Sequence, residues 1–148
     1  MRMLQTAVVA SAFLVVSGSV EAQSRPNFSG QWVVVQPQEN AGEKIDVTHT
    51  ATALTEAHGS EHSMTHKLDG TQSRNVFPSH DTEIVMLSTA TWVGNTLVVK
   101  VTTTYAAGNK VERKQVWSLD ADGRLTVELT DHMNTPAEKV IKQIYKKA

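Results

Sequence analysis

Three histidines, with a methionine among them, are the residues of this chain best suited to metal chemistry. His58, His62 and His66 recur at every fourth position, and Met64 lies between the last two. On a helix they would share one face, but the Gly, Ser and Thr residues among them favour a strand and a turn. In a strand, His62 and His66 would be about 13 Å apart at ~3.3 Å per residue, too far to share one ion bound at ~2.1 Å.

A copper or zinc site therefore needs further ligands. His49, His80 or His132 could supply one from a neighbouring strand, and a soft set of His and Met would suit copper. The alternative is structural, because the alternation of a strand by itself places Met64 and His66 on the inner face. One histidine would then form hydrogen bonds inside a cavity.

Groups for enzymatic catalysis are poorly represented. The chain contains no cysteine, which excludes thiol hydrolases, and none of its serines lies in a Gly-x-Ser-x-Gly turn. Asp81 and Glu83 flank Thr82 near His80, but no nucleophile, base and orienting group occur together. The sequence also lacks a phosphate-binding loop, a dinucleotide fingerprint and a zinc-hydrolase motif. We therefore expect that the protein is not an enzyme and binds no cofactor.

The elements that must position these residues are strands. From Trp32 onward, short Thr-rich and β-branched runs are separated by Gly, Asn and Asp, without a sustained helical period. Turn dipeptides at Asp69-Gly70, Gly94-Asn95, Gly108-Asn109 and Asp122-Gly123 predict hairpins between consecutive strands. We predict strands near residues 31–35, 44–49, 53–58, 61–68, 71–75, 82–92, 96–106, 110–119, 124–131 and 139–146.

Alternation places several polar side chains on the apolar face of these strands. Arg113 and Gln115 share a face with Trp117, and Gln143 shares one with Tyr145. Polar groups in such positions are typical of a cavity wall, where water or a ligand satisfies them. We therefore expect these strands to surround a hollow interior.

Closure of the sheet follows from the number of strands. A sheet of ten strands has two long unpaired edges unless it curls on itself, and a barrel of that width is not filled by its own side chains. The segment from Val76 to Asp81, with Pro78, is expected to form a rim loop. The sequence thus predicts an all-β fold, an antiparallel up-and-down meander closed into a barrel of about 8–10 strands.

Both ends of the predicted domain carry recognisable motifs. Asn27-Phe28-Ser29-Gly30-Gln31-Trp32 opens the domain, and Gln143-Ile144-Tyr145-Lys146-Lys147-Ala148 closes it. These motifs resemble those of the calycins: Gly-x-Trp resembles the lipocalin and fatty-acid-binding-protein signature, and Tyr-Lys-Lys resembles the last strand of the fatty-acid-binding proteins. The chain is also similar to small secreted bacterial lipocalin-like proteins.

The resemblance implies a calycin-like barrel with a ligand inside and with Trp32 as a plug at one end. Two features depart from the fatty-acid-binding proteins. Their helical lid after the first strand is absent, and Gln143 stands where they have an arginine that holds the ligand carboxylate.

The first 22 residues have the pattern of a secretory signal peptide. Arg2 precedes an apolar run from Ala7 to Val16, and Val20 and Ala22 provide small residues before a cut. The run is too short for an anchored helix. We predict a signal peptide at 1–22, a single barrel domain at 23–148, and a periplasmic or secreted protein with no stable membrane insertion after cleavage.

The net charge of the chain limits the classes of molecule that it is expected to bind. The net charge is only −1, so no basic field directs the protein toward nucleic acid. The main prediction is a binding protein that holds a small apolar or amphipathic molecule inside the barrel. The alternatives are a copper- or zinc-binding protein that uses its His and Met residues, and a packed barrel that acts through its surface. The predicted ligand-binding residues are Met64, His66, Trp92, Tyr105, Arg113, Gln115, Trp117 and Tyr145.

Overall fold

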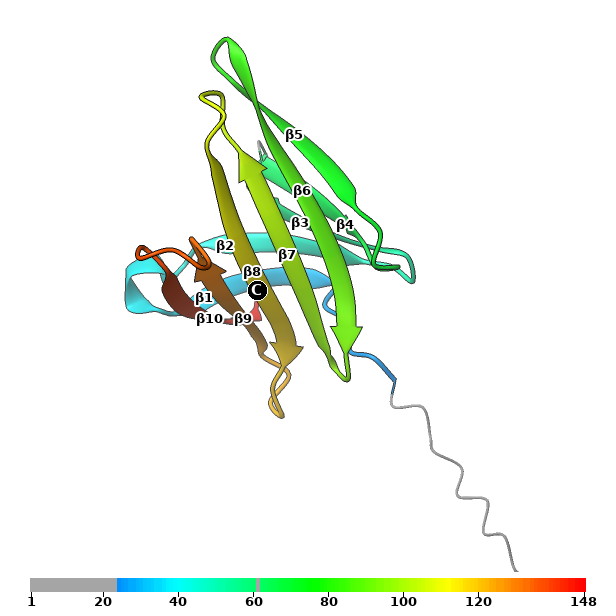
Figure 1. Cartoon of the computed structure of the whole chain (residues 1–148). Helices are drawn as coiled ribbons and strands as arrows, with labels where there is room; N and C mark the ends of the chain where they lie inside the picture. Colours follow the sequence, from blue (N-terminus) through cyan, green and yellow to red (C-terminus); the bar gives the residue numbers. More distant parts are fainter. Residues whose placement is uncertain (1–23, 61) are drawn as a thin grey trace, which may run out of the picture.

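The computed structural model describes residues 24–60 and 62–148, which form an antiparallel β-sheet of ten strands (Figure 1). The strand order is β4-β3-β2-β1-β10-β9-β8-β7-β6-β5, so strands that are consecutive along the chain pair with each other, except β4 with β5, and β1 pairs with β10. This order confirms the predicted up-and-down meander. The strands are β1 (Gly30–Gln36), β2 (Lys44–His49), β3 (Ala53–His58), β4 (His62–Lys67), β5 (Ser73–Ser79), β6 (Thr82–Val93), β7 (Thr96–Thr104), β8 (Lys110–Leu119), β9 (Leu125–Asp131) and β10 (Lys139–Lys147), with a 3₁₀-helix η1 (Gln38–Asn40) after β1.

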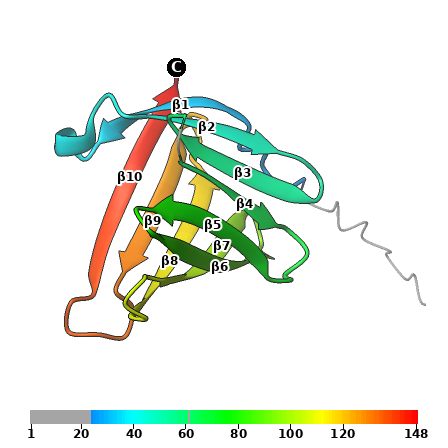
Figure 2. The same cartoon turned by 90° about the horizontal axis from the view of Figure 1, so that it is seen from above.

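The sheet curls into a nearly closed barrel, and β4 and β5 are the two strands that meet at its seam (Figure 2). Side chains bridge this seam. The Asn75 amide accepts a hydrogen bond from the Thr65 backbone N–H at 2.9 Å and donates one to the Thr65 carbonyl at 3.1 Å. The Ser73 hydroxyl accepts a third, from the Lys67 N–H at 2.8 Å. The Asn75 amide thus takes the place of a peptide group between the two edges.

One end of the barrel is packed solid. Phe28, Trp32 and Trp117 are almost completely buried there, and the Trp32 indole donates to the Phe28 carbonyl at 2.8 Å. Leu97 and Leu125 are fully buried in the same core cluster. We call these five residues the closed end. Trp32 therefore has the plug position that the resemblance to calycins implies.

The segment predicted as a rim loop is instead part of a strand. β5 continues from Ser73 through Pro78 to Ser79, where we predicted a strand at 71–75 and a loop at 76–81. Pro78 lacks an N–H group, but β5 is an edge strand, and only one of its sides needs partners, so the ladder with β6 is kept. The other predicted strands match within a few residues.

The predicted signal peptide at residues 1–22 lies outside the described residues. Among the residues that the structure does describe, no helix is long and apolar enough to cross a bilayer.

Candidate ligand-binding interior

The strand register places most of the predicted ligand-binding residues on the inner face of the barrel. Trp117 lies opposite Leu97, Gln115 opposite Val99, and Arg113 opposite Val101. Leu97, Val99 and Val101 are all buried in the core, so β8 presents its Arg113 and Gln115 side chains to the interior as the alternation predicts.

Packing changes along the barrel axis. Toward the ends of the strands opposite the closed end, inward-facing side chains are only partly buried, among them Ile84, Met86 and Leu129. An inward apolar side chain that keeps solvent contact must border a space that the barrel's own side chains do not fill. We call this region the open half. Its partly buried inward side chains are Met64, Phe77, Ile84, Met86, Tyr105, Val111, Arg113, Gln115, Leu129, Ile141 and Gln143.

An ion pair lies in the open half. The Arg113 Nε donates to Asp131 Oδ1 at 2.6 Å, and His132 Nδ1 lies 3.2 Å from Asp131 Oδ2. The exposed fractions of the Arg113 and Asp131 side chains are 28% and 23%. The guanidinium is therefore anchored through one edge while solvent, or a bound molecule, can still reach the side chain.

This ion pair keeps both groups charged. Burial alone lowers the pKa of the Arg113 guanidinium, but the hydrogen bond and charge of Asp131, with a contribution from Tyr105, raise that pKa above its ordinary value. For Asp131, burial raises the pKa of the carboxyl, but the hydrogen bond and charge of Arg113 outweigh it and lower that pKa. Arg113 is thus a permanent cation of the interior.

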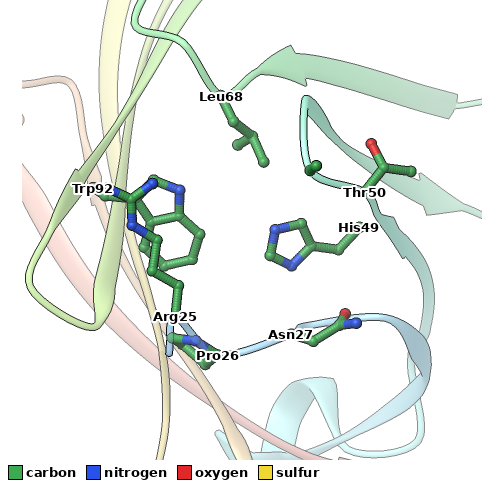
Figure 3. Close-up of a pocket in the computed structure, with 8 residues that line it drawn as sticks. Arg25, Pro26, Asn27, His49, Thr50, Leu68 and Trp92 are labelled. Atoms are coloured by element: carbon green, nitrogen blue, oxygen red, sulfur yellow. The ribbon is translucent and has the colours of Figure 1, made fainter. Parts of the chain in front are cut away.

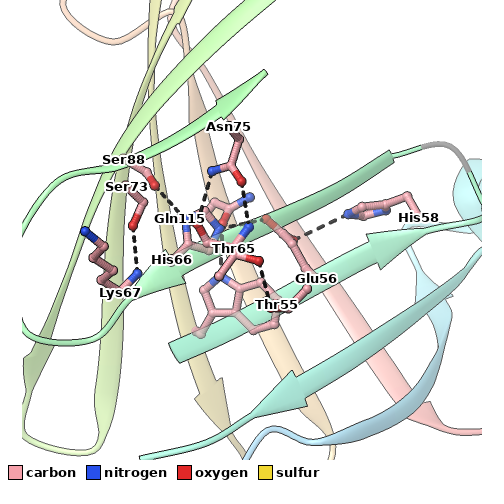
Figure 4. A network of polar contacts seen from close by, with 11 residues as sticks. Thr55, Glu56, His58, Thr65, His66, Lys67, Ser73, Asn75, Ser88 and Gln115 are labelled. Carbon is pink, nitrogen blue, oxygen red and sulfur yellow. Dashed lines mark hydrogen bonds and ion pairs between the residues drawn. The ribbon is translucent and has the colours of Figure 1, made fainter. Parts of the chain in front are cut away.

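A buried polar network joins β3, β4 and β6 deeper in the barrel (Figure 4). His66 Nε2 lies 3.3 Å from Glu56 Oε1, and His66 Nδ1 lies 2.8 Å from the Ser88 hydroxyl. The second carboxylate oxygen of Glu56 lies 3.4 Å from His58 Nε2. When His66 donates its Nε2–H to Glu56, its Nδ1 accepts a hydrogen bond from Ser88.

Glu56 is an ionised carboxylate despite its burial. Desolvation raises the pKa of Glu56, but the hydrogen bonds and charges of His58 and His66 outweigh it and lower that pKa to about 2. The hydrogen bond to Glu56, with its charge, raises the pKa of His58, although burial opposes the shift. The order Ser, His, carboxylate is that of some hydrolases, but Ser88 and His66 are 1% and 0% exposed. The network therefore fixes the strands and offers no accessible nucleophile.

Two partly buried glutamines of the open half form hydrogen bonds with buried aromatic side chains. The Gln115 Oε1 accepts a hydrogen bond from the Trp117 indole at 3.0 Å, and the Gln143 Oε1 accepts one from the Tyr145 hydroxyl at 2.9 Å. Burial, followed by the charges of Glu56 and Glu43, raises the pKa of Tyr145, so its phenol stays protonated as a donor. Each glutamine keeps its amide N–H groups as donors for a polar atom in the interior.

The eight predicted residues do not form one site. Met64, Tyr105, Arg113 and Gln115 line the open half, whereas His66, Trp117 and Tyr145 are buried beneath it. Trp92 lies at the closed end, opposite Leu97. Tyr105 directly follows the last residue of β7, eight positions beyond Leu97, so Trp92 and Tyr105 are separated by about 26 Å at ~3.3 Å per residue.

Sequence reasoning did not single out Glu56, Ser88 or Asp131. The signal for Glu56 was present, since Leu54 and His58 share its face in the same strand. Asp131 likewise follows the inward Val127 and Leu129 in β9. Their pairing with His66 and Arg113 depends on the register between strands, which local alternation does not reveal.

Within residues 24–60 and 62–148, no group of three or more His, Cys, Asp or Glu side chains is arranged to hold a metal ion. Comparison with known proteins adds no assignment, because no protein-family model and no curated protein matches the chain. The candidate site therefore rests on its own geometry.

Proposed function

We propose that the protein is an exported carrier that holds a small apolar or amphipathic molecule in the open half of its barrel. The observation that carries this proposal is the partial burial of side chains that point inward, such as Met86 and Leu129. Apolar walls of this kind supply most of the affinity for a small molecule, and a few polar groups fix its orientation.

The polar groups of the interior support an amphipathic ligand. Arg113 and Tyr105 provide donors near the mouth, while Met64, Met86 and Leu129 provide apolar surface. Thr103 adds a further polar group, because its hydroxyl is fully buried and has no hydrogen-bond partner among the described residues. A buried hydroxyl is ordinarily satisfied by water or by a ligand.

Uptake of a neutral, environment-sensitive dye such as Nile red tests the proposal. We expect wild-type protein to bind the dye with a rise in fluorescence, and Arg113→Ala and Tyr105→Ala each to weaken binding about fivefold, because both substitutions remove interior contact area. Fluorescence titration measures the dissociation constants, and circular dichroism checks that the variants are folded.

Arg124→Ala is the matched control. Arg124 forms its ion pairs with Asp120 and Asp122 in the β8–β9 turn and does not face the interior, so its loss should leave dye affinity unchanged. Equal dye affinity in all four proteins, or no binding by the wild type, would contradict an internal site.

A further inference from the structure

A second pocket lies on the outer side of the closed end (Figure 3). It has a volume of about 290 Å³. The segment Arg25–Asn27 forms one wall, and Leu68, which directly follows β4, and Trp92, near the end of β6, form another. The remaining lining residues, His49, Thr50 and Ala51, belong to β2 and the turn that follows it.

Buried aromatic packing separates this pocket from the open half. The Phe28 ring stacks on His49 at 5.5 Å and on Trp92 at 5.8 Å between ring centroids, and it meets Trp117 at 5.9 Å with the rings tilted. Phe28, Leu54 and Trp117 are fully buried. A molecule in this pocket would therefore not enter the barrel interior.

Arg25 provides a positioned cation. Its guanidinium carbon lies 5.2 Å from the centroid of the Trp92 ring. A guanidinium that stacks on an aromatic face keeps the N–H groups of its edge available. Arg113 and Arg124 form ion pairs with aspartates, but Arg25 forms none within the part of the chain that the structure describes.

His49 provides a second donor. Its Nδ1 accepts a hydrogen bond from the Phe28 N–H at 3.1 Å, so a neutral ring carries its proton on Nε2. Burial lowers the pKa of His49, which favours that neutral form. The ring also packs beside Trp92, with 5.8 Å between the two ring centroids (Figure 3). The Nε2–H group of His49 is thus a donor for a molecule that lies in this pocket.

The polar side chains that line this pocket are mainly hydrogen-bond donors. Arg25, His49 and Asn27 offer N–H donors, whereas none of the described residues that line the pocket is an Asp or a Glu. Pro26, Leu68 and Trp92 supply apolar surface beside these donors. A cation with convergent donors selects an anionic oxygen group, and the apolar walls select a body with little polarity.

We propose that this pocket binds a small organic carboxylate with an apolar body, held by Arg25 and His49 and packed against Trp92 and Leu68. The carboxylate accepts hydrogen bonds from the guanidinium edge and from the imidazole N–H. The site is separate from the carrier function proposed for the interior, and either could exist without the other.

Benzoate is a suitable probe, with benzamide as its uncharged analogue. The chain has three tryptophans, and their indole N–H signals can be followed by NMR in the tag-free protein without residues 1–22. The Trp32 and Trp117 indoles donate to the Phe28 carbonyl and to Gln115, and Trp92→Phe identifies the third signal. We expect benzoate to shift the Trp92 signal with saturation in the millimolar range, and benzamide to have little effect.

Arg25→Gln should weaken benzoate binding about tenfold or more, because a charge-assisted hydrogen bond is lost. Arg124→Gln makes the same change of charge away from the pocket and should leave the affinity unchanged. An equal loss in both variants, or a Trp92 signal that does not move, would overturn the proposal. A shift of the Trp117 signal in place of the Trp92 signal would overturn it too, since benzoate would then occupy the interior.

Discussion

Glu56 is the residue on which the buried network depends. Glu56 is 3% exposed, and its carboxylate contacts the buried His66 imidazole and the exposed His58 imidazole, so a neutral group in its place would remove a charged acceptor from a buried site. A network of this kind is stabilising only when all its members are satisfied. The stability of the barrel should therefore depend on the negative charge of the Glu56 carboxylate.

Glu56→Gln should lower the free energy of unfolding by about 3 kcal/mol, because it removes the charged partner of His58 and His66. Urea denaturation at neutral pH measures the loss. Glu128→Gln is a matched control, since Glu128 is exposed in β9, and it should change stability by less than about 0.5 kcal/mol. Similar losses in the two variants would show that the network adds nothing.

The pKa shifts of Glu56 and His58 predict opposite pH dependences. The pKa of Glu56 falls from 4.5 to about 2, so its contribution is complete above pH 4.5 and is lost as the pH drops toward 2. The pKa of His58 is raised above 6.5, so its contribution is complete below pH 6.5 and is lost as the pH rises through the raised value.

Urea midpoints of wild type and His58→Gln, measured between pH 5 and pH 9, check the histidine part. The difference should be largest at the acid end and should shrink as the pH rises. A difference that grows with pH would refute the ion pair.

The inward position of Arg113 and Gln115 could be predicted from the sequence because alternation in one strand decides it. The contact of Ser88 with His66 could not, since these residues are 22 positions apart and meet only across the seam of the barrel. For the same reason, Trp92 was grouped with residues that lie at the other end of the molecule. Alternation indicates the face of a side chain but not its height along the barrel axis.

Among the strands, β5 shows most clearly where local patterns fail. Its Pro78 indicated a break in the meander, yet an edge strand accommodates a proline. The strands at 44–49, 53–58 and 110–119 could be predicted at their observed bounds because turn residues and β-branched runs mark both their ends. Which strands are edges depends on closure, and closure is a property of the whole sheet.

The seam between β4 and β5 gives a prediction for these two strands. Asn75→Ala removes both hydrogen bonds to Thr65, so we expect hydrogen exchange of the Thr65 amide to become about tenfold faster or more. The Lys67 amide should be affected less, because Ser73 still accepts its hydrogen bond. Asn109→Ala, in the β7–β8 turn, is the control, and equal exchange in the two variants would argue against the bridge.

For the whole molecule, the predicted signal peptide at residues 1–22 would export the proposed carrier. We predict that protein produced with its full sequence in a bacterial host is recovered from the periplasm or the medium with Gln23 as its first residue. Mass spectrometry of the N-terminal peptide checks the cut. Recovery of the chain with residues 1–22 attached would contradict the predicted signal peptide.

The bridged seam also determines how the barrel should come apart. Nine strand pairs are joined by backbone ladders, whereas β4 and β5 are joined by side-chain bonds. Under force or mild denaturant, we expect the molecule to unzip at this line first and to expose two unpaired strand edges. Such edges pair readily with those of another chain. Partial opening, rather than global unfolding, is therefore the step at which two copies would exchange strands and begin to aggregate.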